Sequence, residues 1–205
     1  MRKLKESVVY GLYALGSLSI IGGLFAFEAF RNVDESLETK YVTKDIFEET
    51  YPVVNVQKTV ERPFNDASVQ IVTHFYNPQD ENHENSIIYY ENTYMPNTGV
   101  IYKNETTFDV LSIYEGEVIS VEYDEIMGNV VTIKHTDNIL SVYQSLEDVK
   151  VNTGDYVNPS EIIGVSGKNN LSSSLKEHLH LEIIVNGKTV NPEECYGKTL
   201  EELNN

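Results

Sequence analysis

The sequence predicts a mainly β protein, in which one antiparallel β domain follows a single N-terminal transmembrane helix and a stalk. Three observations lead to this prediction: an uncharged apolar run close to the N-terminus, a charged stretch with prolines behind it, and a series of short strand-like segments in the rest of the chain. Of the 205 residues, 40% are hydrophobic, which is too apolar for a disordered chain and sufficient for one buried core.

The apolar run covers residues 8–27 and contains no charged side chain. As a helix it would extend about 30 Å, which matches the hydrocarbon core of a membrane. A cleaved signal peptide is the alternative, but its apolar segment would be only about 7–15 residues long and would end in a small-x-small site, which is missing here. The side chains expected to anchor the chain in the membrane are Val8, Leu12, Leu15, Ile20, Leu24 and Phe27.

The two sides of this run differ in charge. Arg2, Lys3 and Lys5 precede it, whereas residues 28–205 contain 12 lysines and arginines against 31 acidic residues. By the positive-inside rule, residues 1–7 form a cytoplasmic stub and the C-terminal domain is extracytoplasmic, so we expect a single-pass membrane protein. The acidic domain would repel the phosphates of nucleic acids, which excludes a nucleic-acid-binding role. The chain has one cysteine and therefore no internal disulfide.

Behind the predicted membrane helix, residues 28–66 are charged and loosely patterned. Pro52 and Pro63 argue against one continuous helix there, so we expect a stalk or linker. We expect the β domain to span residues 67–198 and a C-terminal tail to span 199–205. Runs rich in Val, Ile, Tyr and Thr recur between turn residues at 86–94, 108–113, 116–123, 129–135, 139–146, 161–167 and 179–187. The Asn-Gly pair that ends the last run predicts a two-residue hairpin turn.

The pair His178 and His180 is the sharpest candidate for a functional site. Residues i and i+2 of a strand point to the same face, so both imidazoles would project together. Two such histidines suit a metal site or a ligand next to a general base, although they also occur as ordinary polar residues of a strand. Of the other histidines, we expect His135 to be structural and His74 and His83 to be solvated.

Several segments, taken in order, resemble the LytM/M23 peptidase family, the lysostaphin-like zinc endopeptidases of bacterial cell walls. The resemblance implies an antiparallel β fold. It also implies a zinc site made by an HxxxD motif and the second histidine of an HxH motif, with the first histidine of HxH and the histidine of a Y-x-H-L segment assisting the attacking water. The matching segments are residues 116–135, 143–146, 154–157, 163–167 and 178–182.

Carried over residue by residue, the resemblance implies a broken catalytic site. His180 matches a zinc ligand and His178 matches a catalytic histidine. The HxxxD motif falls on Asn97 and Ile101, and the histidine of Y-x-H-L is replaced by Ser145. Only one of three ligands remains, whereas catalytic zinc normally keeps three protein ligands, and an aliphatic side chain cannot replace a carboxylate. We therefore expect no metal, no cofactor and no peptidase activity.

Residues 69–192 further resemble one branch of the family, the stage II sporulation protein Q proteins of endospore-forming bacteria. This resemblance implies a protein of the forespore membrane that reaches into the space between forespore and mother cell. There it would bind the extracellular domain of a stage III sporulation protein AH-type partner, forming a zipper and a ring-like channel needed for engulfment and forespore development. The alternatives are a LytM regulator that activates a cell-wall amidase and, least favoured, a zinc endopeptidase of peptidoglycan. The sequence does not identify the partner-binding residues, and the former cleft could still contact peptidoglycan.

Overall fold

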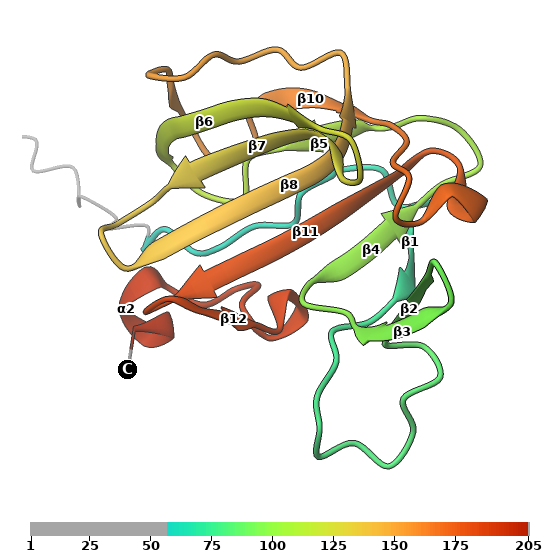
Figure 1. The fold of residues 1–205 in the computed structure, drawn as a ribbon. Helices are drawn as coiled ribbons and strands as arrows, with labels where there is room; N and C mark the ends of the chain where they lie inside the picture. The colour runs from blue at the N-terminus through green and yellow to red at the C-terminus, as the bar shows by residue number, and fades with distance from the viewer. Residues whose placement is uncertain (1–56, 205) are drawn as a thin grey trace, which may run out of the picture. The chain divides into compact units, whose positions relative to one another are not determined.

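The computed structural model describes residues 57–204, which form the β domain drawn in Figure 1. Apart from strands, the described residues contain only the short helix α2 (Leu200–Leu203) and two turns of 3-10 helix, η1 (Ser173–Leu175) and η2 (Pro192–Glu194). The strands are β1 Gln70–Thr73, β2 Ile87–Tyr90, β3 Thr93–Pro96, β4 Val100–Lys103, β5 Asp109–Leu111, β6 Gly116–Asp124, β7 Gly128–Lys134, β8 Ile139–Glu147, β9 Tyr156–Val157, β10 Ile162–Ser166, β11 His178–Val185 and β12 Lys188–Val190.

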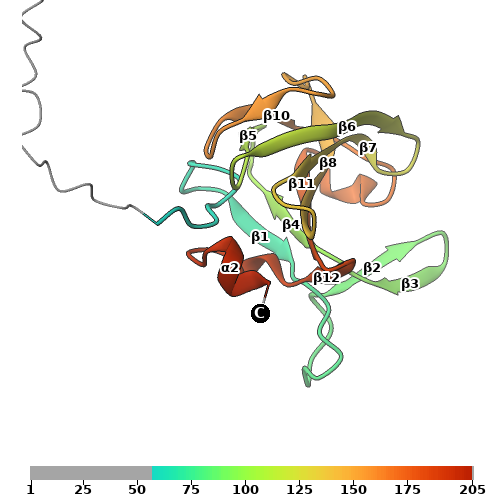
Figure 2. The same ribbon diagram turned by 90° about the vertical axis from the view of Figure 1, so that its left-hand side faces the viewer.

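Most strands belong to one twisted antiparallel sheet, which confirms the predicted fold class of the β domain. Its main path runs β1-β4-β11-β8-β7-β6-β9, with β12 beside β11 and β10 between β5 and β8. Figures 1 and 2 show β4, β11, β8 and β7 lying side by side, while the β2–β3 hairpin projects from one end as a separate small sheet. The candidate site is therefore built on the central strands β4, β11 and β8.

Alternation along these central strands separates the core from the site. Val100 and Tyr102 of β4 and Leu179 and Leu181 of β11 are fully buried in the main apolar core. The residues between them point to the other face of the sheet, because successive side chains of a strand alternate. That opposite face carries the two histidines of the HxH pair, as the sequence pattern predicts.

Tight turns close two of the hairpins. Asn186 and Gly187 join β11 to β12 with φ values of 51° and 75°, so the predicted Asn-Gly turn is confirmed. Glu91 and Asn92 join β2 to β3 with φ values of 46° and 64°. Positive φ at both central positions is the geometry that matches the right-handed twist of paired strands.

The domain begins before the boundary predicted at residue 67. Val60 is 2% exposed within the main core, and its backbone N–H donates to the carbonyl of Lys198 at 2.8 Å. The backbone N–H of Glu61 likewise donates to the carbonyl of Ile113. The last residues of the predicted stalk therefore belong to the domain, because they bury an apolar side chain and satisfy backbone groups of two other segments.

The predicted C-terminal tail also belongs to the domain. Thr199 caps α2 in a capping box, in which its side chain accepts from the backbone of Glu202 and the Glu202 carboxylate accepts from the backbone of Thr199. Leu200 and Leu203 pack against the main core. The tail thus folds onto the sheet because its two leucines share one face of a capped helical turn.

The stub at residues 1–7, the membrane helix predicted at 8–27 and most of the stalk lie outside the described residues. Between residues 57 and 204 no helix is long and apolar enough to cross a membrane.

Candidate functional site

The pairing of β4 with β11 brings the predicted site residues together. Ile101 lies directly opposite His180, and Lys103 lies directly opposite His178. Directly opposite residues of an antiparallel pair project to the same face, so Ile101 and His180 are neighbours on it. On its other side, β11 pairs with β8, which places Gln144 opposite His180.

His180 is held in one orientation by β8. Its Nδ1 lies 2.9 Å from the side-chain oxygen of Gln144 and donates its proton to that oxygen, which leaves Nε2 as an unprotonated acceptor. This Nε2 is buried without a hydrogen-bond partner, and the side chain is only 2% exposed. Burial, followed by repulsion from a protonated His178, lowers the pKa of His180 from 6.5 to about 4, so the imidazole is neutral at physiological pH.

His178 is also neutral and buried, but both of its nitrogens are used. Its Nδ1 donates to the carbonyl of Lys176 at 2.7 Å, and its Nε2 accepts from the hydroxyl of Ser145 at 3.0 Å. The amide of Asn169 donates to the same serine oxygen at 2.7 Å. Burial is the main cause that lowers the pKa of His178. Ser145, which the resemblance aligns with a catalytic histidine of the family, is thus a hydrogen-bond donor to His178.

A serine next to a histidine is also the arrangement of a nucleophile and its base, but access rules out that chemistry here. Ser145 and His178 are both 0% exposed, so no substrate carbonyl can reach the hydroxyl. Ser145 has a φ of 66°, and its backbone N–H donates to the carbonyl of Met127, outside the pairing of β8 with β11. The serine therefore serves as a buried link between β8, His178 and Asn169.

Asn97 is fully engaged with the backbone around it. Its side-chain amide donates to the carbonyl of His74 at 2.9 Å and to the carbonyl of Gly99 at 2.8 Å, and the side chain is 1% exposed. Gly99 lies so close to β11 that a Cβ there would meet the carbonyl of Leu181 at 2.2 Å and Nε2 of His180 at 2.8 Å. Asn97 thus holds the turn into β4 in place while the glycine lets the backbone approach the histidine.

Ile101 belongs to a second, smaller apolar cluster. Ile88 of β2 and Leu171 pack with it, and all three are less than 10% exposed. Partly buried apolar side chains border this cluster: Tyr90, Met95, Met127 and Leu175. The β2–β3 hairpin and the segment before η1 thus cover the position that the HxxxD motif would give to a carboxylate.

These residues do not fit the zinc ion that the family resemblance implies. His180 offers one free imidazole nitrogen, but the two matched partner positions hold an amide with its donors occupied and an aliphatic side chain. Zinc in a catalytic site needs three protein ligands with nitrogen, oxygen or sulfur donors. Within residues 57–204, no group of three or more His, Cys, Asp or Glu side chains could hold a metal ion.

Two of the three remaining histidines, His135 and His74, have hydrogen-bond partners, whereas the buried Nδ1 of His83 has none among the described residues. His135 has hydrogen bonds of 2.8 Å at both nitrogens, to the carbonyl of Glu115 and to the hydroxyl of Ser141, which agrees with the predicted structural role. His74 and His83 differ from the prediction that they are merely solvated. Nδ1 of His74 lies 2.7 Å from a carboxylate oxygen of Glu193, and the ring of His83 lies 4.6 Å from that of Tyr76.

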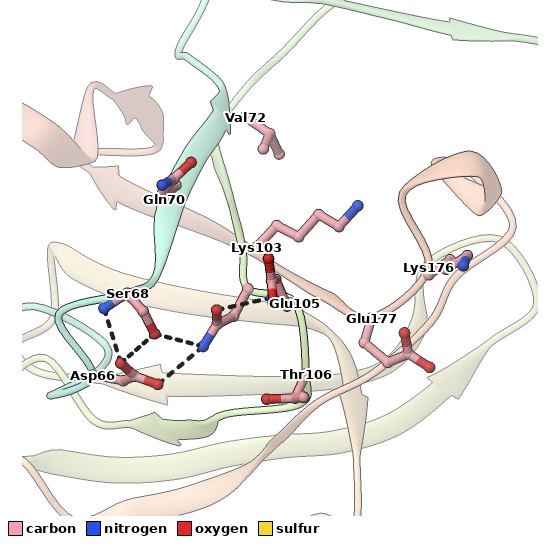
Figure 3. A pocket seen from close by; sticks show the side chains of 10 residues that line it. Asp66, Ser68, Gln70, Val72, Lys103, Glu105, Thr106, Lys176 and Glu177 are labelled. Carbon is pink, nitrogen blue, oxygen red and sulfur yellow. Dashed lines mark hydrogen bonds between the residues drawn. The ribbon is translucent and has the colours of Figure 1, made fainter.

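A cavity of about 860 Å³ lies next to this site, between β1, the end of β4 and the segment before β11 (Figure 3). Sequence reasoning did not identify it, because its lining comes from three separate segments with no motif in common. Asp66 is fixed by hydrogen bonds from Ser68 and Asn104, and those from Ser68 are the main cause that lowers its carboxyl pKa. The charged and polar residues that line the cavity include Asp66, Gln70, Lys103, Glu105, Lys176 and Glu177.

Comparison with known proteins identifies the family of this chain. Residues 95–192 match the family model described as Peptidase family M23. The chain is 34% identical to Stage II sporulation protein Q of Bacillus subtilis (strain 168) over 168 residues, which cover 80% of this chain and 55% of that protein. The chain therefore spans little more than half of this curated relative.

Two solved structures of SpoIIQ with SpoIIIAH contain a similar chain. A SpoIIQ–SpoIIIAH pore-forming complex includes a chain that matches with a TM-score of 0.69 and 33% identity, over 72% of this chain and 96% of that one. A second SpoIIIAH–SpoIIQ complex includes a chain that matches with a TM-score of 0.64 and 35% identity, over 66% of this chain and 99% of that one.

Proposed function

This chain belongs to peptidase family M23, in the branch of stage II sporulation protein Q, and from that premise we propose that it is a membrane-anchored binding protein of sporulation without peptidase activity. Its partner is the extracellular domain of a stage III sporulation protein AH-type protein. The two proteins meet in the space between forespore and mother cell and form the zipper and ring-like channel that engulfment and forespore development require.

The observation that carries the binding role is the match to nearly the whole of a chain that is bound in a SpoIIQ–SpoIIIAH complex. Identity of 33–35% over 96–99% of a chain found in such a complex supports a shared fold and a shared use of its surface. Residues 28–205 carry 12 basic and 31 acidic residues, so a basic surface on the partner would accelerate encounter.

The absence of peptidase activity is supported by the surroundings of His180. A peptidase of this family needs a metal-activated water in an open cleft, and a zinc ion lowers the pKa of such a water to about 7. Here Ile101 and Asn97 offer no metal ligand, and both histidines are at most 2% exposed. The described residues therefore provide neither a metal-activated water as nucleophile nor an open cleft for a peptide substrate.

The membrane location is supported by the sequence. Residues 8–27 are uncharged and long enough to span a bilayer, with basic residues before them and acidic residues after them. In this proposal the N-terminus lies in the forespore cytoplasm, and the β domain projects from the forespore membrane into the intermembrane space.

The test is a binding measurement with the full chain in detergent micelles. The extracellular domain of the AH-type protein from the same organism should form a complex that elutes as one peak in size-exclusion chromatography and gives a saturable calorimetric isotherm. A cell-wall amidase of the same organism serves as the comparison. Binding of the amidase in place of the AH-type domain, or release of peptide from peptidoglycan in the presence of zinc, would overturn the proposal.

A further inference from the structure

One edge of the main sheet is open over half of a long strand. The terminal strand β9 pairs only with Gly116 and Glu117 of β6. From Ile119 to Asp124, a segment that we term the open β6 edge, β6 pairs with β7 alone among the described residues. Figures 1 and 2 show β7 lying alongside β6. Alternate backbone N–H and C=O groups of this edge therefore point away from β7 and can bind another strand.

Large apolar side chains border this edge. Tyr123 near its end is 70% exposed, Ile119 at its start is 39% exposed, and Tyr156 of β9 is 64% exposed. Tyrosine supplies a large contact area with little loss of side-chain entropy, and it is enriched at the centres of protein interfaces. The two exposed tyrosines beside this edge are therefore typical of a protein-binding surface.

The charge of the edge is of one sign. Residues 115–126 contain five acidic residues and no lysine or arginine. Glu115 pairs with Lys58 at 2.5 Å, and the carboxylate of Asp124 accepts from two backbone N–H groups of its own turn. The other three, Glu117, Glu122 and Glu125, are exposed, and the described residues provide them with no ion pair.

The acidic side chains and the irregular pairing of β6 indicate what kind of strand could bind to the open β6 edge. The pairing of β6 with β7 shifts register between Val118 and Ser120, and bulges and edge charges both hinder uncontrolled strand pairing. Two copies of this edge side by side would place unpaired carboxylates against each other, which disfavours self-association. A strand that carries lysine or arginine side chains would meet the same carboxylates with opposite charge.

We propose that the open β6 edge is a docking surface for a basic β-strand of a partner domain, which extends the sheet beyond β6. Tyr123 anchors the added strand, and Glu122 and Glu125 pair with its cations. This inference rests on the proposed function, in which the AH-type domain supplies the strand, and it adds the surface on which that domain docks.

The test compares charge reversals at two places on the full chain in detergent. The double variant E122K/E125K should weaken binding of the AH-type domain by about tenfold or more, since attraction becomes repulsion at the edge. E81K/E84K makes the same change in net charge at two exposed glutamates outside the edge and should bind as the native chain does. Tyr123→Ala should likewise weaken binding, whereas Tyr94→Ala, at the 74% exposed tyrosine of the β2–β3 hairpin, should not.

Hydrogen exchange gives a second readout that tests strand addition itself. Alternate amides between Ile119 and Asp124 should exchange more slowly in the complex than in the free chain. If the native chain binds and E122K/E125K binds equally well, or if these amides gain no protection, the docking surface is wrong and the proposed function stands. If the native chain does not bind the AH-type domain, both fail. A dimer of the chain that E122K/E125K abolishes would show that the edge pairs with a second copy.

Discussion

Ile101 and His180 face each other across the pairing of β4 with β11, and the Nε2 of His180 has no hydrogen-bond partner. An acceptor nitrogen beside an aliphatic side chain is an uncommon arrangement, because a buried polar atom without a partner costs about 1–3 kcal/mol. The resemblance to the family implies a carboxylate at the position of Ile101, sharing a metal ion with this histidine. We therefore propose that the free nitrogen is what remains of an incomplete set of metal ligands.

Restoring the two missing ligands should restore metal binding. We expect the double variant N97H/I101D to bind about one zinc ion per chain, because His180 already presents a neutral nitrogen. Atomic absorption after dialysis measures the metal, and zinc in hundredfold excess over its Kd should raise stability by about 2.7 kcal/mol. The matched control N97H/I88D places the new carboxylate elsewhere in the same apolar cluster and should bind no zinc. Equal zinc content of the two variants would show that the motif was mapped onto the wrong residues.

The link between Ser145 and His178 should contribute measurably to stability. Ser145→Ala removes the donor to Nε2 of His178 and the acceptor for the amide of Asn169, so we expect a loss of about 1–3 kcal/mol in urea unfolding. Ser173→Ala, at an exposed serine of η1, should change stability by less than about 0.5 kcal/mol. Equal midpoints for the two variants would contradict a structural role for Ser145.

Alternation and turn chemistry were sufficient to predict much of the sheet. The runs that became β6, β7, β8 and β11 alternate or are rich in branched residues, and the Asn-Gly turn defines its hairpin. The same reasoning missed β1 and β4. The four residues of β4 are buried or nearly so on both faces and do not alternate, and β1 is a short edge strand that only its partner defines. Val60 was missed because it packs against residues from the far end of the chain.

The alternation of side chains along a strand also made part of the candidate site predictable. That His178 and His180 share a face follows from strand geometry alone. The hydrogen bond from Ser145 to His178 does not follow from it, since it depends on a left-handed backbone at Ser145. The apolar cover over Ile101 joins Ile88 to Leu171 from a segment far along the chain, and no local pattern reports such a contact.

The buried histidines should make the domain less stable in mild acid. Burial holds the pKa of His180 at about 4 in the folded state against 6.5 when it is unfolded, and it also lowers the pKa of His135 and His178. Below pH 6.5 these histidines bind protons in the unfolded chain but not in the folded chain. Their contribution to the free energy of unfolding is therefore fully present above that pH and is lost as the pH decreases toward 4. Each fully neutral histidine contributes a slope of about 1.4 kcal/mol per pH unit.

The measurement is urea unfolding at pH 7 and pH 5. His180→Gln removes one titrating group, so its loss of stability between these two pH values should be about 2 kcal/mol smaller than that of the native chain. The carboxyl groups with lowered pKa, such as Asp124, lose most of their contribution below about pH 4.5 and change little between pH 7 and pH 5. The same loss in the native chain and in His180→Gln would mean that His180 is charged in the folded state.

The orientation of the chain in the membrane can be tested by cysteine labelling, because the native cysteine is buried and should give no background signal. Cys195 is 2% exposed, and burial raises the pKa of its thiol to about 11, so a maleimide that cannot cross membranes should not label the native chain. Glu81→Cys, at an exposed position of the β domain, should be labelled on intact cells that express the full chain. Lys3→Cys should be labelled only after the cells are permeabilised, because the positive-inside bias places the stub in the cytoplasm. The reverse pattern would place the β domain in the cytoplasm, where it could not meet a partner from the opposite membrane.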